Sequence, residues 1–153
     1  MCRISQESQR LKEELLNLID ADTDAFNDVL DAYRMPHDTE DQVSLRNTTI
    51  DDAMKEASNI PFRTLQCCRE IINYTKEAAE YGNPNSVTDA GVAAEMANAG
   101  AQGAALNVNI NLNEIDDVQF CKKMKKHTDM LVKESADGLA KVREIVLGKL
   151  KSE

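Results

Sequence analysis

The chain has 153 residues, of which 42% are hydrophobic, 29% are charged and only 4% are aromatic, and its net charge is −9. These values are typical of a folded domain with an aliphatic core and exclude a disordered chain. The acidic charge argues against nonspecific nucleic-acid binding, and the chain has no run of about 18 apolar residues that could span a membrane. The first ten residues also lack the apolar segment of a signal peptide, so we expect a cytoplasmic protein.

The first predicted element is an amphipathic helix over residues 8–34, where apolar side chains recur at spacings of three and four. Asp22 is the exception, because it falls on the apolar stripe and is therefore expected on the core face. A buried carboxylate needs a partner. Asp22 either forms an ion pair with Arg46 or Arg69, or it belongs to a functional site.

Two further helices are predicted in the middle of the chain. The first begins after Asp38 or Thr39, since both residue types favour the N-cap position. Pro61 lacks the N–H group that an inner helical turn uses, so we expect it to kink or break this helix. Another helix then follows over residues 62–81.

The segment "GNPNSVTDAGVAA" (82–94) predicts a turn followed by a helix start. Asn83 precedes proline in the turn, and Ser86 with Asp89 matches the S-x-x-D pattern of a capping box. We therefore expect a helix from about Val87. A final helix is predicted over residues 117–150.

The segment "ALNVNINLNEIDD" (105–117) alternates apolar residues with asparagine, a pattern that usually indicates a strand. However, residues 90–105 contain eleven alanines or glycines, and a strand here would have no partner strand to satisfy its backbone groups. We therefore predict a helix, in which Asn107 and Asn111 share one face. Buried amides need hydrogen-bond partners, which a ligand could supply. The chain is thus expected to be one domain over residues 1–153, an all-α bundle of about five helices.

Cysteine and histidine spacing indicates no metal site. Four cysteines show no CxxC spacing, and the two histidines stand apart: Cys2, Cys67, Cys68, Cys121, His37 and His127. We interpret the cysteines as reduced thiols and expect no metal site.

Three segments together resemble the cyclodeaminase/cyclohydrolase family of folate enzymes. They are "LIDADTDAFNDVLDAYRMP" (18–36), "GNPNSVTDAGVAA" (82–94) and "GAALNVNINLNEIDD" (103–117). The resemblance covers nearly the whole chain and implies an all-α fold and a homodimer or higher homo-oligomer. It also implies that the chain begins after an N-terminal Pro/Gly-rich motif and about two Ala-rich helices of the family.

The resemblance implies a tetrahydrofolate derivative as substrate, with no cofactor. In the cyclodeaminase reaction a folate nitrogen attacks a formimino carbon and ammonia leaves, whereas in the cyclohydrolase reaction water opens a methenyl bridge. Both reactions move protons, which carboxylates can transfer. The candidate catalytic residues are Asp22 and Asp89, and the candidate substrate-binding residues are Phe26, Asn83, Ser86, Asn107 and Asn111.

Each candidate also has a plain structural interpretation. Asp89, Asn83 and Ser86 could only cap helices, and Phe26 could be a core residue rather than a pterin-stacking one. The cations available for the folate glutamate are Arg34, Arg46, Arg63, Lys76 and the lysines of residues 122–126. An alternative function is a non-catalytic helical subunit that acts through oligomerisation, and a third is a bundle whose asparagine face only binds water.

Overall fold

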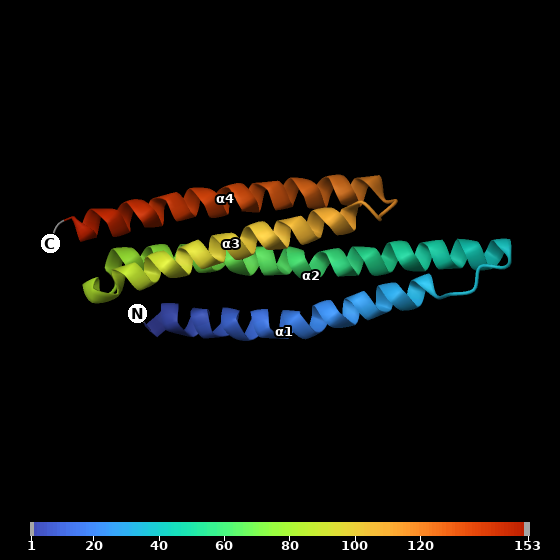
Figure 1. Ribbon diagram of the computed structural model, residues 1–153, viewed down its shortest axis with the longest axis horizontal. Coiled ribbons are helices and arrows are strands. Elements are labelled where there is room, and N and C mark those ends of the chain that lie inside the picture. The colour runs from blue at the N-terminus through green and yellow to red at the C-terminus, as the bar shows by residue number, and fades with distance from the viewer. Residues whose placement is uncertain (1, 152–153) are drawn as a thin grey trace.

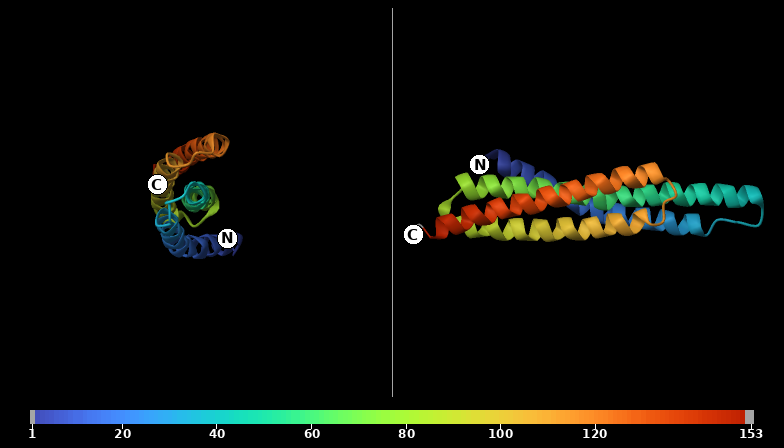
Figure 2. Two further views of the ribbon diagram at one scale, coloured as in Figure 1. Left: turned by 90° about the vertical axis from the view of Figure 1, so that its right-hand side faces the viewer. Right: turned by 90° about the horizontal axis from the view of Figure 1, so that it is seen from above.

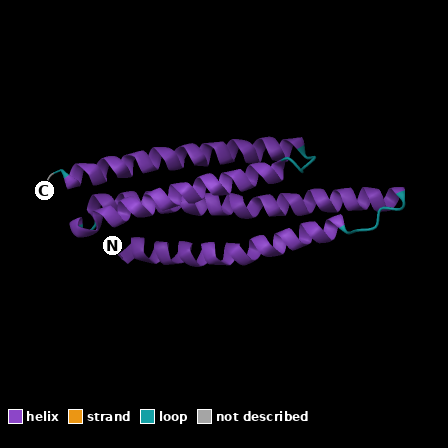
Figure 3. Cartoon of the chain, in the orientation of Figure 1, coloured by secondary structure: helices purple, strands orange, loops and turns teal. Residues whose placement is uncertain are grey.

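The computed structural model describes residues 2–151, whose long helices lie side by side (Figure 1). They are α1 (Cys2–Tyr33), α2 (Glu40–Tyr81), α3 (Val87–Leu112) and α4 (Val118–Leu150), and a short 3₁₀ turn, η1 (Pro84–Ser86), precedes α3. The described residues contain no strand (Figure 3). The predicted all-α class and the helical form of the asparagine segment are confirmed, but residues 2–151 form four long helices rather than five.

The helix count differs because α2 continues through Pro61. Proline has no N–H, so the carbonyl of Ala57 loses its partner within the helix. Asn111 of α3 replaces that partner, because its Nδ2 donates a hydrogen bond to the Ala57 oxygen at 3.0 Å. With this carbonyl satisfied from α3, α2 can pass the proline without ending, and the expected break does not occur.

α2 is the helix on which the others pack. It contacts α1, α3 and α4, and the end-on view shows these three arranged around it (Figure 2). α1 and α3 run in the same direction, with their N-terminal ends at the same end of the bundle (Figure 1). Among the described residues, no helix is long and apolar enough to cross a membrane.

The inner face of α3 consists mainly of alanine. Ala94 and Ala101 are fully buried, and Leu65 and Cys68 of α2 pack against the α3 alanines. α4 also comes close to α2, since a Cβ added at Gly138 would lie 2.7 Å from Cγ2 of Ile72. Small side chains therefore let three helices approach closely, which suits a core with few aromatic residues.

Ion pairs fix α1 against α2. Arg63 of α2 binds the Glu14 carboxylate, and Arg10 of α1 reaches Glu14 and Glu70, each at 2.9 Å. The hydrogen bond from Arg63 lowers the pKa of Glu14 below its ordinary value. These contacts lie along the α1–α2 boundary and hold α1 in a defined position.

The cysteines are free thiols where the structure describes them. Cys67 and Cys68 are buried and Cys121 is half-buried, while the Cys2 side chain lies outside the described residues. Burial raises the pKa of the Cys67 thiol to about 11. A thiol that stays protonated at neutral pH is a poor nucleophile, so Cys67 serves packing.

Candidate functional site

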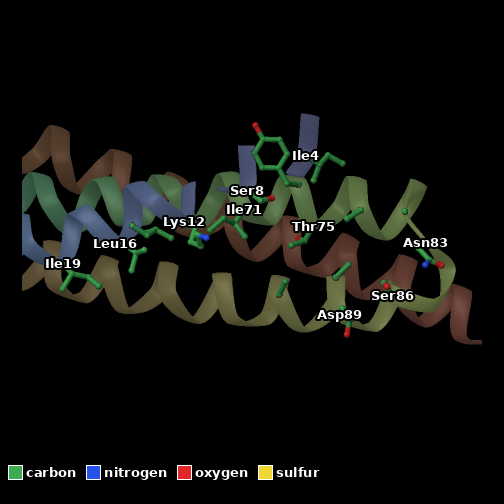
Figure 4. A pocket seen from close by; sticks show the side chains of 16 residues that line it. Ile4, Ser8, Lys12, Leu16, Ile19, Ile71, Thr75, Asn83, Ser86 and Asp89 are labelled. Carbon is green, nitrogen blue, oxygen red and sulfur yellow. The ribbon is translucent and has the colours of Figure 1, made fainter. Parts of the chain in front are cut away.

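A groove runs between α1 and α3 with α2 as its floor, and it contains two adjoining cavities. The larger has a volume of about 700 Å³ and the smaller about 350 Å³. Leu15 and Ile19 of α1 line both cavities, so the two form one continuous groove. Figure 4 shows the larger cavity, with Asn83, Ser86 and Asp89 toward one end and Leu16 and Ile19 toward the other.

The larger cavity brings together three of the predicted residues: Asn83, Ser86 and Asp89. The predicted capping box is wrong, because the Ser86 side chain makes no cap hydrogen bond. η1 runs directly into α3, so the N–H of Val87 already donates to the Pro84 carbonyl. The hydroxyl of Ser86 is thus not used for capping, and it lines the cavity together with the carboxylate of Asp89.

The smaller cavity brings Asp22 of α1 and Asn107 of α3 together, with Thr23 and Thr64 beside them. Asp22 is exposed, so its predicted place on the core face is wrong. The reason is that α1 faces an open groove at this level rather than a closed core. The ion-pair alternative also fails, because Arg46 binds the Tyr33 carbonyl and Arg69 binds Glu134.

The two amides predicted to act together have different environments. Asn107 is exposed and faces the groove, whereas Asn111 is half-buried and donates to Ala57 as described above. Asn111 therefore finds its hydrogen-bond partner within the chain, on α2, rather than in a ligand. Its contact with Ala57 gives it the structural role of joining α3 to α2, which also positions Asn107 one turn away.

Phe26 lies outside the groove. Its side chain is 60% exposed, so the core interpretation is wrong, and it lines neither cavity. Several predicted cations are already engaged, since Arg34 binds Asp31 and Arg63 binds Glu14. Lys122 and Lys125 line a different hollow, between α3 and α4, together with Asn107 and Asn109.

Sequence reasoning missed Lys12, which is the basic residue that lines the larger cavity (Figure 4). Within residues 2–151 it makes no ion pair, whereas the nearby Arg3 and Arg10 are both paired with glutamates. The available signal was local: residues three and four positions away from Lys12 are Ser8, Gln9, Leu15 and Leu16, so no acidic side chain on the same helix face can neutralise it.

Comparison with known families decides which kind of protein carries this groove. The family model described as "Formiminotransferase-cyclodeaminase" matches residues 1–130. The chain belongs to this family. The resemblance of the three segments is thereby confirmed, and the helical asparagine segment that borders the groove is part of the family match.

Individual relatives agree with this assignment. The chain is 34% identical to the methenyltetrahydrofolate cyclohydrolase of Methylorubrum extorquens over 97% of its length and 71% of the relative's. It is 35% identical to a formimidoyltransferase-cyclodeaminase of Dictyostelium discoideum, but it covers only 22% of that longer protein. The crystal structure of formiminotetrahydrofolate cyclodeaminase from Thermotoga maritima matches with a TM-score of 0.85 and 26% identity, over 97% of this chain and 70% of that one.

Proposed function

We propose that the chain is a folate one-carbon enzyme, a formiminotetrahydrofolate cyclodeaminase or a methenyltetrahydrofolate cyclohydrolase. The proposal rests on one observation beyond family membership: Asp22 and Asn107, from two helices, line the same small cavity. A carboxylate that transfers protons and an amide that orients the reacting group are what both reactions need.

The two reactions differ in the nucleophile that attacks the one-carbon unit. In the cyclodeaminase reaction N10 attacks the formimino carbon on N5, a C–N bond forms, and the formimino nitrogen leaves as ammonia. In the cyclohydrolase reaction water adds to the methenyl carbon and one C–N bond of the bridge breaks. In each case we assign to Asp22 the acceptance of the nucleophile's proton and its return to the leaving nitrogen.

The groove also suits the remaining parts of a folate. With the pterin near Asp22 and Asn107, the aminobenzoyl ring would lie along Leu15 and Ile19, which line both cavities. Lys12 is ten positions before Asp22 on α1, about 15 Å along the helix at 1.5 Å per residue. This position suits an ammonium group that binds the glutamate carboxylates.

Asp89 has a separate place in this arrangement. It lies 18 positions before Asn107 on α3, about 27 Å along the helix axis. The two candidate carboxylates, Asp22 and Asp89, are thus too far apart to act on the same carbon atom. We assign the proton transfer to Asp22 and keep Asp89, with Asn83 and Ser86, as polar groups at the far end of the groove.

The test is to assay the purified chain with both substrates, measuring ammonia release from 5-formiminotetrahydrofolate and loss of absorbance from 5,10-methenyltetrahydrofolate. Asp22→Asn should lower kcat by about 100-fold or more. Asp20→Asn is the matched control, because Asp20 is exposed on the same helix and lines neither cavity. Equal rates for wild type and Asp22→Asn would remove Asp22 from the chemistry. Absence of turnover of either substrate by the folded chain would contradict the proposed function and favour a non-catalytic subunit.

A further inference from the structure

The smaller cavity of the groove offers a ligand only neutral and negative groups. Its polar lining consists of Asp22, Thr23, Thr64 and Asn107, and no lysine, arginine or histidine is among its lining residues. Within residues 2–151 Asp22 also has no ion-pair partner, so its charge beside the cavity is uncompensated. The cavity therefore suits a ligand group that brings its own positive charge.

The two threonines of this cavity can accept hydrogen bonds but have no hydroxyl hydrogen left to donate. The Thr23 hydroxyl donates its hydrogen to the Ile19 carbonyl at 3.2 Å. The Thr64 hydroxyl likewise donates to the Ile60 carbonyl at 3.2 Å. A hydroxyl group has one hydrogen and two lone pairs, so each oxygen keeps only lone pairs for a ligand. Pro61, which also lines the cavity, has no N–H to add.

The charges of α1 give the groove a positive end and a negative end. From Glu13 to Tyr33 the helix carries seven acidic residues and no lysine or arginine. Lys12 lines the larger cavity but not the smaller one, and it lies ten positions before Asp22. Charges of one sign along a groove focus the electric field there, which draws a cation toward the smaller cavity.

A ligand group that matches these acceptors must be cationic and must carry N–H hydrogens. An amidinium group meets both conditions, because its positive charge is shared by two nitrogens that can donate hydrogen bonds. A formyl group of the same shape has an oxygen in place of one nitrogen, so it is neutral and would set lone pairs against lone pairs. A site built of acceptors rejects such an analogue, because its own polar groups are then left unpaired.

We propose that the smaller cavity is an amidinium-binding site, in which Asp22 supplies the counter-charge and Thr64 accepts a hydrogen bond from an N–H of the ligand. The inference rests on the proposed function, because the formimino group on N5 of tetrahydrofolate is an amidine that is protonated at neutral pH. The methenyl bridge is also cationic but has no N–H, so Thr64 favours the formimino substrate. Thr64 is thus a specificity-determining residue that transfers no proton.

A matched pair of ligands tests the charge preference without turnover. In 5-formimino-10-deazatetrahydrofolate and 5-formyl-10-deazatetrahydrofolate an NH₂⁺ group is exchanged for oxygen, and neither ligand can cyclise because carbon replaces N10. Isothermal titration calorimetry of the full chain should show the formimino ligand binding about tenfold more tightly, or more. Equal affinities would overturn the inference and leave the folate function standing, whereas failure of both ligands to bind would overturn both.

Substitutions at Thr64 test the residue itself through the ratio of the two affinities, which does not depend on the fraction of folded protein. Thr64→Val removes the oxygen and should lower the preference for the formimino ligand about fivefold, whereas Thr64→Ser keeps a hydroxyl group and should retain it. Thr48→Val is the matched control, because Thr48 of α2 makes the same kind of hydrogen bond, to the Ser44 carbonyl, and lines neither cavity. An unchanged preference in Thr64→Val would overturn the assignment.

Discussion

The outward faces of α2 and α3 differ in kind, although both helices belong to the same core. Over residues 46–80 the exposed positions of α2 carry polar or charged side chains such as Asp52, Glu56 and Asn73, and the borders of α2 hold α1 and α4 through ion pairs. Large apolar side chains are exposed only near the ends of α2, at Val43, Leu45 and Tyr81. The outward face of α3 carries Val92 and Met96 instead. A helix that is apolar on both sides is expected to be buried on both sides. The middle of α2 is therefore covered within one chain, whereas the outward face of α3 is left open by the described residues.

The largest stability effect is expected where α2 depends on α3 for a polar contact. Asn111→Ala should lower the free energy of unfolding by about 1–3 kcal/mol, because it leaves the Ala57 carbonyl without its donor. Urea denaturation followed by circular dichroism would measure this, with exposed Asn113→Ala as the control.

A double-mutant cycle sharpens the same test. Pro61→Ala restores the N–H that can donate to Ala57 within α2, so Asn111→Ala should cost clearly less in that background. An equal cost in both backgrounds would show that Asn111 does not compensate for the proline.

Substitutions at two glycines compare a covered helix face, at Gly138 of α4, with an exposed one, at Gly103 of α3. Gly138→Ala should destabilise the chain by about 1–3 kcal/mol, because the added methyl group collides with Ile72. Gly103→Ala should instead stabilise α3 by up to about 1 kcal/mol, since alanine is the better helix former and has space there. Melting temperatures of the two variants provide the measurement. A loss of stability of similar size for both would contradict the open outer face of α3.

Lys12 tests the groove that lies between α1 and α3. Tetrahydropteroate lacks the glutamate of tetrahydrofolate, and wild type should bind it about tenfold more weakly, which corresponds to about 1.4 kcal/mol. Lys12→Met should remove this difference, because the ammonium group at the cavity is lost. Lys76→Met, which changes a lysine of α2 that does not line the cavity, should preserve it. Isothermal titration calorimetry would measure the six affinities of the three proteins for the two ligands, and a preference retained in Lys12→Met would place the glutamate elsewhere.

The smallest change in stability is expected when the pH is lowered and the ion pair between Arg63 of α2 and Glu14 of α1 is lost. Arg63 lowers the pKa of Glu14 in the folded state, so the folded form binds this proton less readily than the unfolded form. The stabilisation is complete above the ordinary carboxylate pKa and is lost as the pH falls through the lowered value. We expect a loss of about 0.2–1 kcal/mol between pH 5 and pH 3 that is absent in Glu14→Gln. Equal acid sensitivity of the two proteins, measured by urea denaturation, would rule this contribution out.

The sequence by itself determined the helical class and most helix boundaries, because these depend on local periodicity and on caps such as Thr39 and Asp117. It also determined the family, since three long segments resemble it directly. Tertiary structure decided what depends on contacts between distant residues. Pro61 does not end α2, because Asn111, fifty positions further on, supplies the missing hydrogen bond.

The candidate site divides in the same way. The residue types at Asp22, Asp89 and Asn107 were apparent from sequence. Periodicity nevertheless placed Asp22 in the core, because a pattern along one helix gives no information about an open groove between two helices. Lys12 was missed because its place at the cavity depends on which side chains of α2 and α3 lie opposite it. Local patterns report which face of a helix is apolar, whereas only packing decides what covers that face.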